Sequence, residues 1–321
     1  MSEKPAVLVT RKLPTAVEER LRRDYDPRFN EDDHVFSGDE LVERAQDVAA
    51  VVPCHSEHFT AEVIARLPES LKAICNFSVG VDHVDLAAAK GRGIVVTNTP
   101  DVLSDATAEI AMLLMLGAAR RASEGDRLVR GGGWKVWSPA FMVGTQITGK
   151  RLGIVGMGRV GQVAAKRARG FDMEIHYHNR RPLPPETAAG AVYHESLEEM
   201  LPLCDVLSLH CPATPESRNL LNAEHIARLP DDAIVVNTAR GALVDDEALI
   251  AALESGRIAA AGLDVFNDEP NIHPGYAALD NAFLLPHIGS ATKETRDAMG
   301  FRALDNLDAI MSGREPGDRV A

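Results

Sequence analysis

The chain has 321 residues, which is enough for two domains that each bury a core. It carries 34 Lys and Arg against 47 Asp and Glu, a net charge of −13. Such a surface repels nucleic acid and anionic membranes, so we expect neither as a partner, and any bound phosphate must be held by local basic residues.

The first ten residues, MSEKPAVLVT, show no basic region followed by an apolar stretch, so we expect no signal peptide. The longest apolar run, IAMLLMLGAA at 110–119, is too short to span a bilayer and predicts a core helix. The four cysteines form no CxxC pair, and we expect reduced, buried thiols in a cytoplasmic protein. No HExxH or clustered Cys/His spacing indicates a metal site.

Short apolar runs alternate with helix-length segments along the whole chain. Several runs are nearly continuous in Val, Ile and Leu, which is typical of strands buried on both faces of a parallel sheet. The alternation therefore predicts an α/β fold. The predicted strands are 6–10, 48–54, 71–75 and 93–98, followed by 151–156, 173–178, 205–210, 233–238, 260–265 and 282–286.

The series predicts two doubly wound units with a break near Pro100. Residues 101–130 predict one long helix, with Asp101 or Ser104 as its cap. A loop containing two tryptophans then leads to the second unit. Residues 291–313 predict another long helix that ends at Gly313.

The segment RLGIVGMGRVGQV contains a G-x-G-x-x-G motif between a predicted strand and a predicted helix. Gly156 permits the tight turn, Gly158 lets a pyrophosphate approach the backbone, and Gly161 lets helix and strand pack closely. The helix N-terminus then offers N–H groups and a partial positive charge to the phosphates. In this context the motif predicts dinucleotide binding.

The next predicted strand is followed by Asn179, Arg180 and Arg181, where an NAD-binding chain usually has an acidic residue. An aspartate there would repel a 2′-phosphate, whereas an arginine fork matches phosphate geometry. The sequence therefore predicts a preference for NADP(H) over NAD(H). The alternative is that both arginines are solvated loop charges.

Three later stretches begin at the carboxyl ends of predicted strands, where open parallel sheets bind ligands. They contain Arg240, Glu269 and His287. An arginine can hold a carboxylate or carbonyl, and a histidine can exchange a proton with a carbonyl oxygen during hydride transfer. A neighbouring glutamate would favour the imidazolium. Alternatively, the arginine and histidine only hold loops in place.

The chain resembles the D-isomer-specific 2-hydroxyacid dehydrogenases over almost its whole length. The segments that carry the resemblance are FSVGVDHVDLAAAKGRGIVVTNTP, DATAEIAMLLML, GIVGMGRVGQ, VVNTARGALVDDEAL, AGLDVFNDEP and LPHIGSAT. Within the family, HYHNRR, WKVWSP and HIGSATKETRDAM are most similar to glyoxylate/hydroxypyruvate reductases.

The resemblance implies that Arg240 binds substrate, that Glu269 pairs with the histidine, and that His287 is the acid/base. It implies that backbone N–H groups of Val79 and Gly80 hold the substrate carboxylate, and that Asp264 bonds the nicotinamide carboxamide. Asn179, Arg180 and Arg181 would bind the ribose phosphate. The other residues implied to line the cofactor site are Thr107, Arg159, Val160, Cys211, Pro212, Thr238, Ala239, His287 and Gly289.

The resemblance also implies a Rossmann-type cofactor domain at 100–286, inserted into a flavodoxin-like substrate-binding domain at 1–99 and 287–321. The cleft between such domains closes over substrate. Family members are typically homodimers through the cofactor domain, and alignment places Trp137 where a loop tryptophan reaches the partner's active site. The alternative for Trp137 is an ordinary interface or core aromatic.

We therefore expect an NADP(H)-preferring reductase that converts small 2-oxo acids, glyoxylate and hydroxypyruvate, to D-2-hydroxy acids. One alternative is a sibling activity such as D-3-phosphoglycerate dehydrogenase, for which we expect one of the shorter forms, without the extra C-terminal regulatory region that some of those enzymes carry. Another is a cofactor-sensing binding protein similar to the co-repressors of this fold family. The sequence does not rank the 2-oxo acids, because one methylene changes binding by only about 1–3 kcal/mol.

Overall fold

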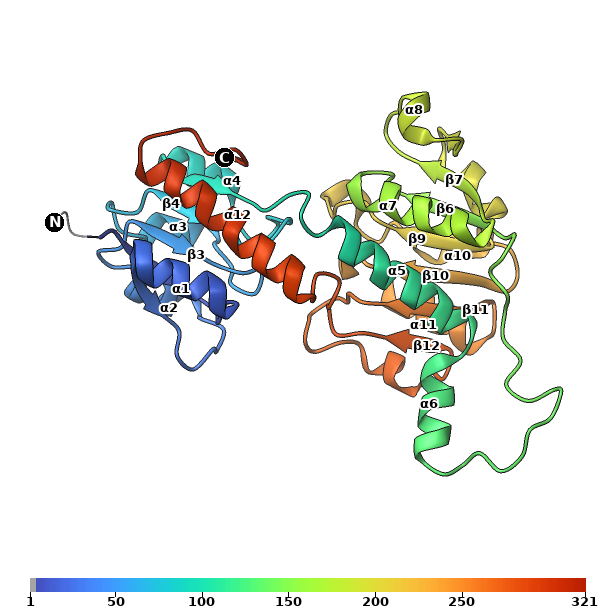
Figure 1. Ribbon diagram of the computed structural model, residues 1–321. Helices are drawn as coiled ribbons and strands as arrows, with labels where there is room; N and C mark the ends of the chain where they lie inside the picture. Colours follow the sequence, from blue (N-terminus) through green and yellow to red (C-terminus); the bar gives the residue numbers. More distant parts are fainter. Residues whose placement is uncertain (1–3) are drawn as a thin grey trace. The chain divides into compact units, whose positions relative to one another are not determined.

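A computed structural model describes residues 4–321 and divides the chain into two compact units (Figure 1). One unit holds the residues up to Leu103 together with Ala291–Ala321, and the other is Ser104–Ser290. Each unit has its own parallel sheet with helices on both faces. The fold class predicted from the sequence, two doubly wound α/β domains, is confirmed.

The first unit has a five-stranded sheet in the order β2-β1-β3-β4-β5, the order of flavodoxin-like sheets. Helices α1 and α12 cover one face and α2, α3 and α4 cover the other. The strands are β1 (Ala6–Val9), β2 (Asp26–Phe29), β3 (Ala50–Val52), β4 (Ala73–Cys75) and β5 (Val95–Thr97). The helices are α1 (Thr15–Asp24), α2 (Gly38–Arg44), α3 (Ala61–Arg66), α4 (Leu86–Gly91) and α12 (Lys293–Met311).

The second unit has a seven-stranded sheet in the order β12-β11-β10-β9-β6-β7-β8. The strand order reverses between β6 and β9, and ligands of doubly wound sheets bind at such a reversal. The strands are β6 (Arg151–Val155), β7 (Glu174–His178), β8 (Val192–His194), β9 (Val206–Leu209), β10 (Ala233–Asn237), β11 (Ile258–Leu263) and β12 (Ala282–Leu284).

Helices cover both faces of this second sheet. Helices α5 and α7 pack on one face, and α9, α10 and α11 pack on the other. The helices are α5 (Ser104–Ala119), α6 (Ala122–Arg130), α7 (Arg159–Ala168), α8 (Pro185–Ala188), α9 (Leu197–Met200), α10 (Ala223–Arg228) and α11 (Asp246–Glu254). Short 3₁₀ turns are η1 (Arg169–Phe171), η2 (Leu201–Leu203), η3 (Pro215–Ser217), η4 (Gly241–Leu243) and η5 (Pro274–Ala278).

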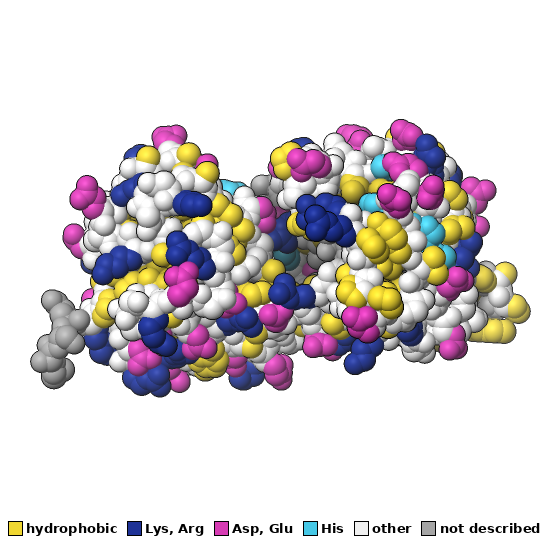
Figure 2. Space-filling model, turned by 90° about the horizontal axis from the view of Figure 1, so that it is seen from above, with side chains coloured by type: hydrophobic (Ala, Val, Ile, Leu, Met, Phe, Trp, Pro, Cys, Tyr) yellow, Lys and Arg dark blue, Asp and Glu magenta, His cyan; other side chains and the backbone are white. Residues whose placement is uncertain are grey.

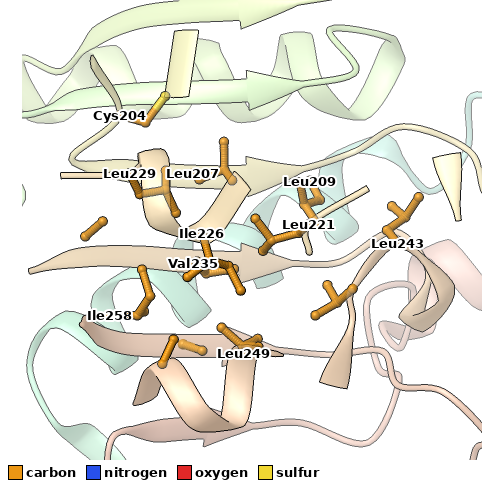
Figure 3. Close-up of a cluster of buried hydrophobic side chains, with 14 of the residues drawn as sticks. Cys204, Leu207, Leu209, Leu221, Ile226, Leu229, Val235, Leu243, Leu249 and Ile258 are labelled. Carbon is orange, nitrogen blue, oxygen red and sulfur yellow. The ribbon is translucent and has the colours of Figure 1, made fainter. Parts of the chain in front are cut away.

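The apolar runs predicted strands correctly because the strands are buried on both faces. Figure 3 shows one side of the core, where Leu207 and Val235 of the sheet meet Ile226 of α10 and Leu249 of α11. Each fully buried Leu or Ile stabilises the fold by about 1.5–3 kcal/mol relative to exposure. This packing fixes the strand ends that carry the candidate site.

The prediction of one helix over 101–130 is wrong, because α5 ends at Ala119 and α6 starts at Ala122. Arg121 adopts a left-handed conformation (φ 53°) between them, and its guanidinium binds Glu124 of α6 through two bonds of 2.8 Å. The carbonyl of Ala119 accepts the N–H of Thr145 at 2.8 Å instead of continuing the helix. A distant segment therefore ends α5.

Two strands were not predicted, β2 and β8, and both lie at sheet edges. Their sequences, DPRF and VYH, are short and partly exposed. An edge strand has a neighbour on one side only, so it tolerates proline and needs no continuous apolar run.

The cysteines, the helices and the surface charges can each be compared with what the sequence predicts. All four cysteines are free; Cys75 and Cys204 are buried, and Cys54 and Cys211 are partly buried. Among the described residues, no helix combines the length and the apolarity that a membrane crossing requires. On the face seen in Figure 2, acidic and basic side chains are interspersed over each unit.

Candidate functional site

The glycine turn lies between β6 and α7, next to the reversal of strand order. Gly156 has φ 93°, and a Cβ there would lie 2.5 Å from the backbone nitrogen of Cys211. A Cβ at Gly161 would lie 2.4 Å from the carbonyl oxygen of Gly156. A Cβ at Gly158 would meet no protein atom within 4 Å, so protein packing does not require this glycine. Its absence of a side chain keeps the approach to the N-terminus of α7 open, as phosphate binding needs.

The end of β7 is tied to this turn. The side-chain oxygen of Asn179 accepts the N–H of Met157 at 2.7 Å, so the amide NH₂ of Asn179 remains as its donor group. Arg180 and Arg181 are exposed, and within residues 4–321 neither forms a salt bridge. The residues that directly follow β7 therefore present donors and positive charge rather than a carboxylate.

Arg240 follows β10 and is positioned by the last residue of that strand. Asn237 is 1% exposed; its amide NH₂ donates to the carbonyl of Arg240 at 2.9 Å, and its side-chain oxygen accepts the N–H of Ala239 at 3.0 Å. A Cβ at Gly241 would lie 1.9 Å from the backbone of Phe266, so the loops after β10 and β11 are in direct contact. The two loops therefore hold each other in place.

His287 and Glu269 meet across two loops. Nδ1 of His287, after β12, lies 2.7 Å from Oε2 of Glu269, and both side chains are about 30% exposed (30% and 28%). The other oxygen of Glu269 accepts the N–H of Phe266 at 2.8 Å. A carboxylate fixed in this way orients the imidazole, with Nε2 on the opposite side of the ring.

Asp264 follows β11 and is 1% exposed. Its carboxylate accepts the N–H groups of Ile288 at 2.8 Å and Gly289 at 2.7 Å, so it holds the loop that begins with His287. Burial raises the pKa of Asp264, and the two N–H donors and the neighbouring His287 oppose that rise. The hydroxyl of Thr107 donates to the carbonyl of Gly289 at 3.3 Å.

His210, Cys211 and Pro212 follow β9. Nε2 of His210 lies 2.8 Å from the Ser208 hydroxyl, and Nδ1 lies 3.4 Å from the Thr238 hydroxyl. Burial lowers the pKa of His210 to about 4, so its ring is neutral near pH 7. Its backbone N–H donates to the carbonyl of Val155 at 2.8 Å. His210 therefore connects the ends of β6, β9 and β10.

The sequence analysis did not identify the parts played by Asn237 and His210. The available signal was the same for both: a polar residue at the end of an otherwise apolar strand. Asn237 is buried and His210 is partly buried, and the neighbouring strand ends supply the hydrogen-bond partners that both side chains need.

The predicted residues are divided between the two units. Val79 and Gly80 lie in the first unit, in the loop after β4. All the others lie in the second unit. There, Arg240, Glu269 and His287 lie in loops at the carboxyl ends of the strands, as does the glycine turn. Trp137 lies in the loop between α6 and β6 and is 72% exposed.

Comparisons with known proteins show the family of the chain. Residues 112–289 match the family model described as the D-isomer specific 2-hydroxyacid dehydrogenase, NAD binding domain. A glycerate dehydrogenase from Hyphomicrobium methylovorum is 47% identical over 97% of this chain and 98% of its own length. A glyoxylate reductase from Thermococcus onnurineus is 43% identical over 98% of this chain and 95% of its own.

Solved structures are similar as well. An NADPH-dependent glyoxylate/hydroxypyruvate reductase from Sinorhizobium meliloti, in complex with NADP and malonate, has a TM-score of 0.88 and 33% identity, and the match covers 99% of this chain and 97% of that one. Matches over essentially the full length at this identity establish the relationship. The chain belongs to the D-isomer specific 2-hydroxyacid dehydrogenase family.

Proposed function

We propose that the protein is an NADPH-preferring reductase of small 2-oxo acids, glyoxylate and hydroxypyruvate, and that its products are D-2-hydroxy acids. The observation that carries the proposal is the 2.7 Å contact between Nδ1 of His287 and Oε2 of Glu269. Both residues lie at the carboxyl ends of the strands of the second sheet, as does Arg240. Relatives named glyoxylate reductase and glycerate dehydrogenase support the substrate class, since glycerate is the 2-hydroxy acid that hydroxypyruvate yields on reduction.

When bound, the reduced nicotinamide supplies the hydride. His287 donates a proton to the carbonyl oxygen of the substrate as the carbonyl carbon is reduced, and Glu269 holds the imidazole in place through Nδ1. Arg240 binds the substrate carbonyl or carboxylate through its guanidinium, which favours the polarised carbonyl. In the first unit, Val79 and Gly80 donate backbone N–H groups to the substrate carboxylate.

The residues at the glycine turn fit a dinucleotide. Gly156, Gly158 and Gly161, with Arg159 and Val160 at the start of α7, would hold the pyrophosphate. Asp264 would accept from the carboxamide, because a carboxylate has about four acceptor positions and two are already used. Residues that would line the rest of the cofactor site are Thr107, Cys211, Pro212, Thr238, Ala239 and Gly289.

The experiment that tests the reaction is product analysis. Hydroxypyruvate incubated with NADPH and the enzyme should yield glycerate, and chiral chromatography should find only the D enantiomer. Formation of L-glycerate would contradict the proposal. So would the absence of reaction, in which neither hydroxypyruvate nor NADPH is consumed.

The preference for NADPH rests on Asn179, Arg180 and Arg181, which would bind the 2′-phosphate. Replacing both arginines with serine is expected to lower kcat/KM for NADPH by about 10–100-fold, since a hydrogen bond to a charged group contributes about 1.5–3 kcal/mol. The kcat/KM for NADH should change little, because NADH has no 2′-phosphate. Steady-state kinetics with both nucleotides measures this.

A matched control is Arg228→Ser, an exposed arginine of α10 that pairs with Glu224 at 2.9 Å. This variant should leave kcat/KM for both NADPH and NADH unchanged. If the double variant loses NADPH and NADH activity equally, or if the wild type prefers NADH, the assignment of the arginines is wrong.

We further propose that two copies associate through the second unit. Helix α6 and the loop after it reach away from the sheet of this unit (Figure 1). Six large apolar side chains on them are exposed, and a patch of this kind marks a contact surface. They are Val129, Trp134, Val136, Trp137, Phe141 and Val143.

Replacing Val136, which is 73% exposed, with aspartate is expected to shift the protein from a dimer of twice 34.6 kDa to a monomer, because a buried unpaired charge opposes association. Light scattering measures the mass.

Trp137→Ala should leave the dimer intact and raise KM for the 2-oxo acid if Trp137 reaches the partner's site. An unchanged KM and substrate ranking would reject that role, and a monomeric wild type would reject the dimer.

A further inference from the structure

We propose that Asn98 is a positioning residue for the substrate: its side-chain amide orients the loop Ser78–Gly80 so that the N–H groups of Val79 and Gly80 face the substrate carboxylate. The proposal rests on the proposed function, which assigns the carboxylate to those two groups. The loop follows β4, and Asn98 follows β5, the adjacent strand of the same sheet.

Every carbonyl of this loop is held by a donor. The carbonyl of Ser78 accepts the N–H of Thr99 at 2.9 Å. The carbonyl of Val79 accepts the amide NH₂ of Asn98 at 2.8 Å. The carbonyl of Gly80 accepts the hydroxyl of Ser78 at 2.7 Å. Three consecutive peptide groups are thus fixed by their oxygen atoms.

A planar trans peptide has its C=O and N–H pointing in opposite directions. Holding the carbonyl of Ser78 therefore sets the direction of the N–H of Val79, and holding the carbonyl of Val79 sets the direction of the N–H of Gly80. Donors that are already oriented toward an anion need no rearrangement when it binds. The bond from Asn98 is the one that fixes the N–H of Gly80.

Asn98 is itself held firmly. Its N–H donates to the carbonyl of Asp318 at 3.2 Å, and its carbonyl accepts the amide of Asn306 at 3.4 Å. The Asp318 carboxylate accepts two bonds from the Arg302 guanidinium of α12, at 2.8 and 2.7 Å. The segment after α12 therefore supports Asn98, and through it the loop that would bind substrate.

Among the three donors, Asn98 is the side chain that can be removed without altering the loop itself. Thr99 donates through its backbone, and Ser78 belongs to the loop. A bond that served only the stability of β5 would change the unfolding temperature when removed, but it would not change substrate binding selectively. Kinetics therefore separate the two roles.

The variant Asn98→Ala is expected to raise KM for glyoxylate about tenfold, the factor that corresponds to the loss of one hydrogen bond of about 1.4 kcal/mol. The KM for NADPH should remain as in the wild type, and kcat should fall less than KM rises. Asp318→Ala should shift KM for glyoxylate in the same direction by a smaller factor.

The matched control is Asn30→Ala in the same unit. The amide of Asn30, a residue that is buried whereas Asn98 is partly buried, donates to the carbonyls of Thr10 at 2.8 Å and His34 at 2.7 Å. This variant should lower the unfolding temperature without changing KM for glyoxylate. If Asn98→Ala leaves that KM unchanged, or raises the KM values for glyoxylate and NADPH equally, the positioning role is overturned.

A binding measurement keeps this proposal separate from the proposed function. Malonate carries carboxylates but is not reduced; titrated into the wild type, it should shift the amide NMR signals of Val79 and Gly80 and bind more weakly to Asn98→Ala. If the wild type reduces no 2-oxo acid yet malonate behaves in this way, the function is wrong and the role of Asn98 stands. If malonate binds both proteins equally, or binds neither, the role of Asn98 is wrong.

Discussion

Replacing His287 with alanine is expected to lower kcat for glyoxylate reduction by about 10²–10⁴-fold, the usual contribution of a positioned general acid. The imidazole is held by Glu269 at 2.7 Å, and no other group is assigned to deliver the proton. The KM for NADPH should change little, because we propose that its phosphates bind at the glycine turn and not at His287. Steady-state kinetics and nucleotide binding, measured on the same preparation, check both parts.

The matched control for this variant is His273→Ala. His273 also forms a histidine–carboxylate pair, with Nε2 3.1 Å from Oε1 of Glu247. That variant should keep near wild-type kcat. Turnover by His287→Ala within a few-fold of the wild type would show that the acid/base has been assigned to the wrong residue.

Replacing Arg240 with alanine is expected to lower kcat/KM for the 2-oxo acid by about 10²–10³-fold, since truncating one partner of a hydrogen-bonded charge pair costs about 2–5 kcal/mol. Arg240→Lys should recover only part of the loss, because an ammonium group cannot reproduce the planar fork of the guanidinium. The KM for NADPH should stay near the wild-type value in both variants.

Arg257→Lys provides the comparison within the same unit. Arg257 donates to the carbonyl of Pro230 at 2.9 Å and is part of the scaffold. Its replacement should lower stability and leave kcat/KM near the wild-type value. An Arg240→Ala enzyme with unaltered kcat/KM would remove Arg240 from the substrate site.

The sequence was sufficient to predict the buried strands and the glycine turn, because both follow from local pattern. Strands such as Val206–Leu209 and Ala233–Asn237 are apolar at nearly every position since both of their faces are covered. The end of α5 at Ala119 and the edge strand Val192–His194 were missed. The end of α5 depends on Thr145, a residue distant in sequence that bonds the carbonyl of Ala119. The edge strand depends on its pairing with β7.

For the site, the parallel-sheet rule predicts from sequence that Arg240 and His287 lie at the carboxyl ends of strands of one sheet. The rule does not predict that Asp264 holds the His287 loop, and the pairing of His287 with Glu269, 18 residues away, is implied only by the resemblance. Those contacts depend on how two loops fold against each other. The resemblance implies roles for these residues, which remain proposals, and the structure shows the hydrogen bonds that position them.

The most direct test of the account is the fall in absorbance at 340 nm when the wild-type enzyme is mixed with NADPH and a panel of 2-oxo acids, with NADH in parallel. The account predicts turnover of glyoxylate and hydroxypyruvate at ordinary enzyme rates, about 1–10³ s⁻¹, and a higher kcat/KM with NADPH than with NADH. Absence of turnover on every 2-oxo acid with either nucleotide would contradict it.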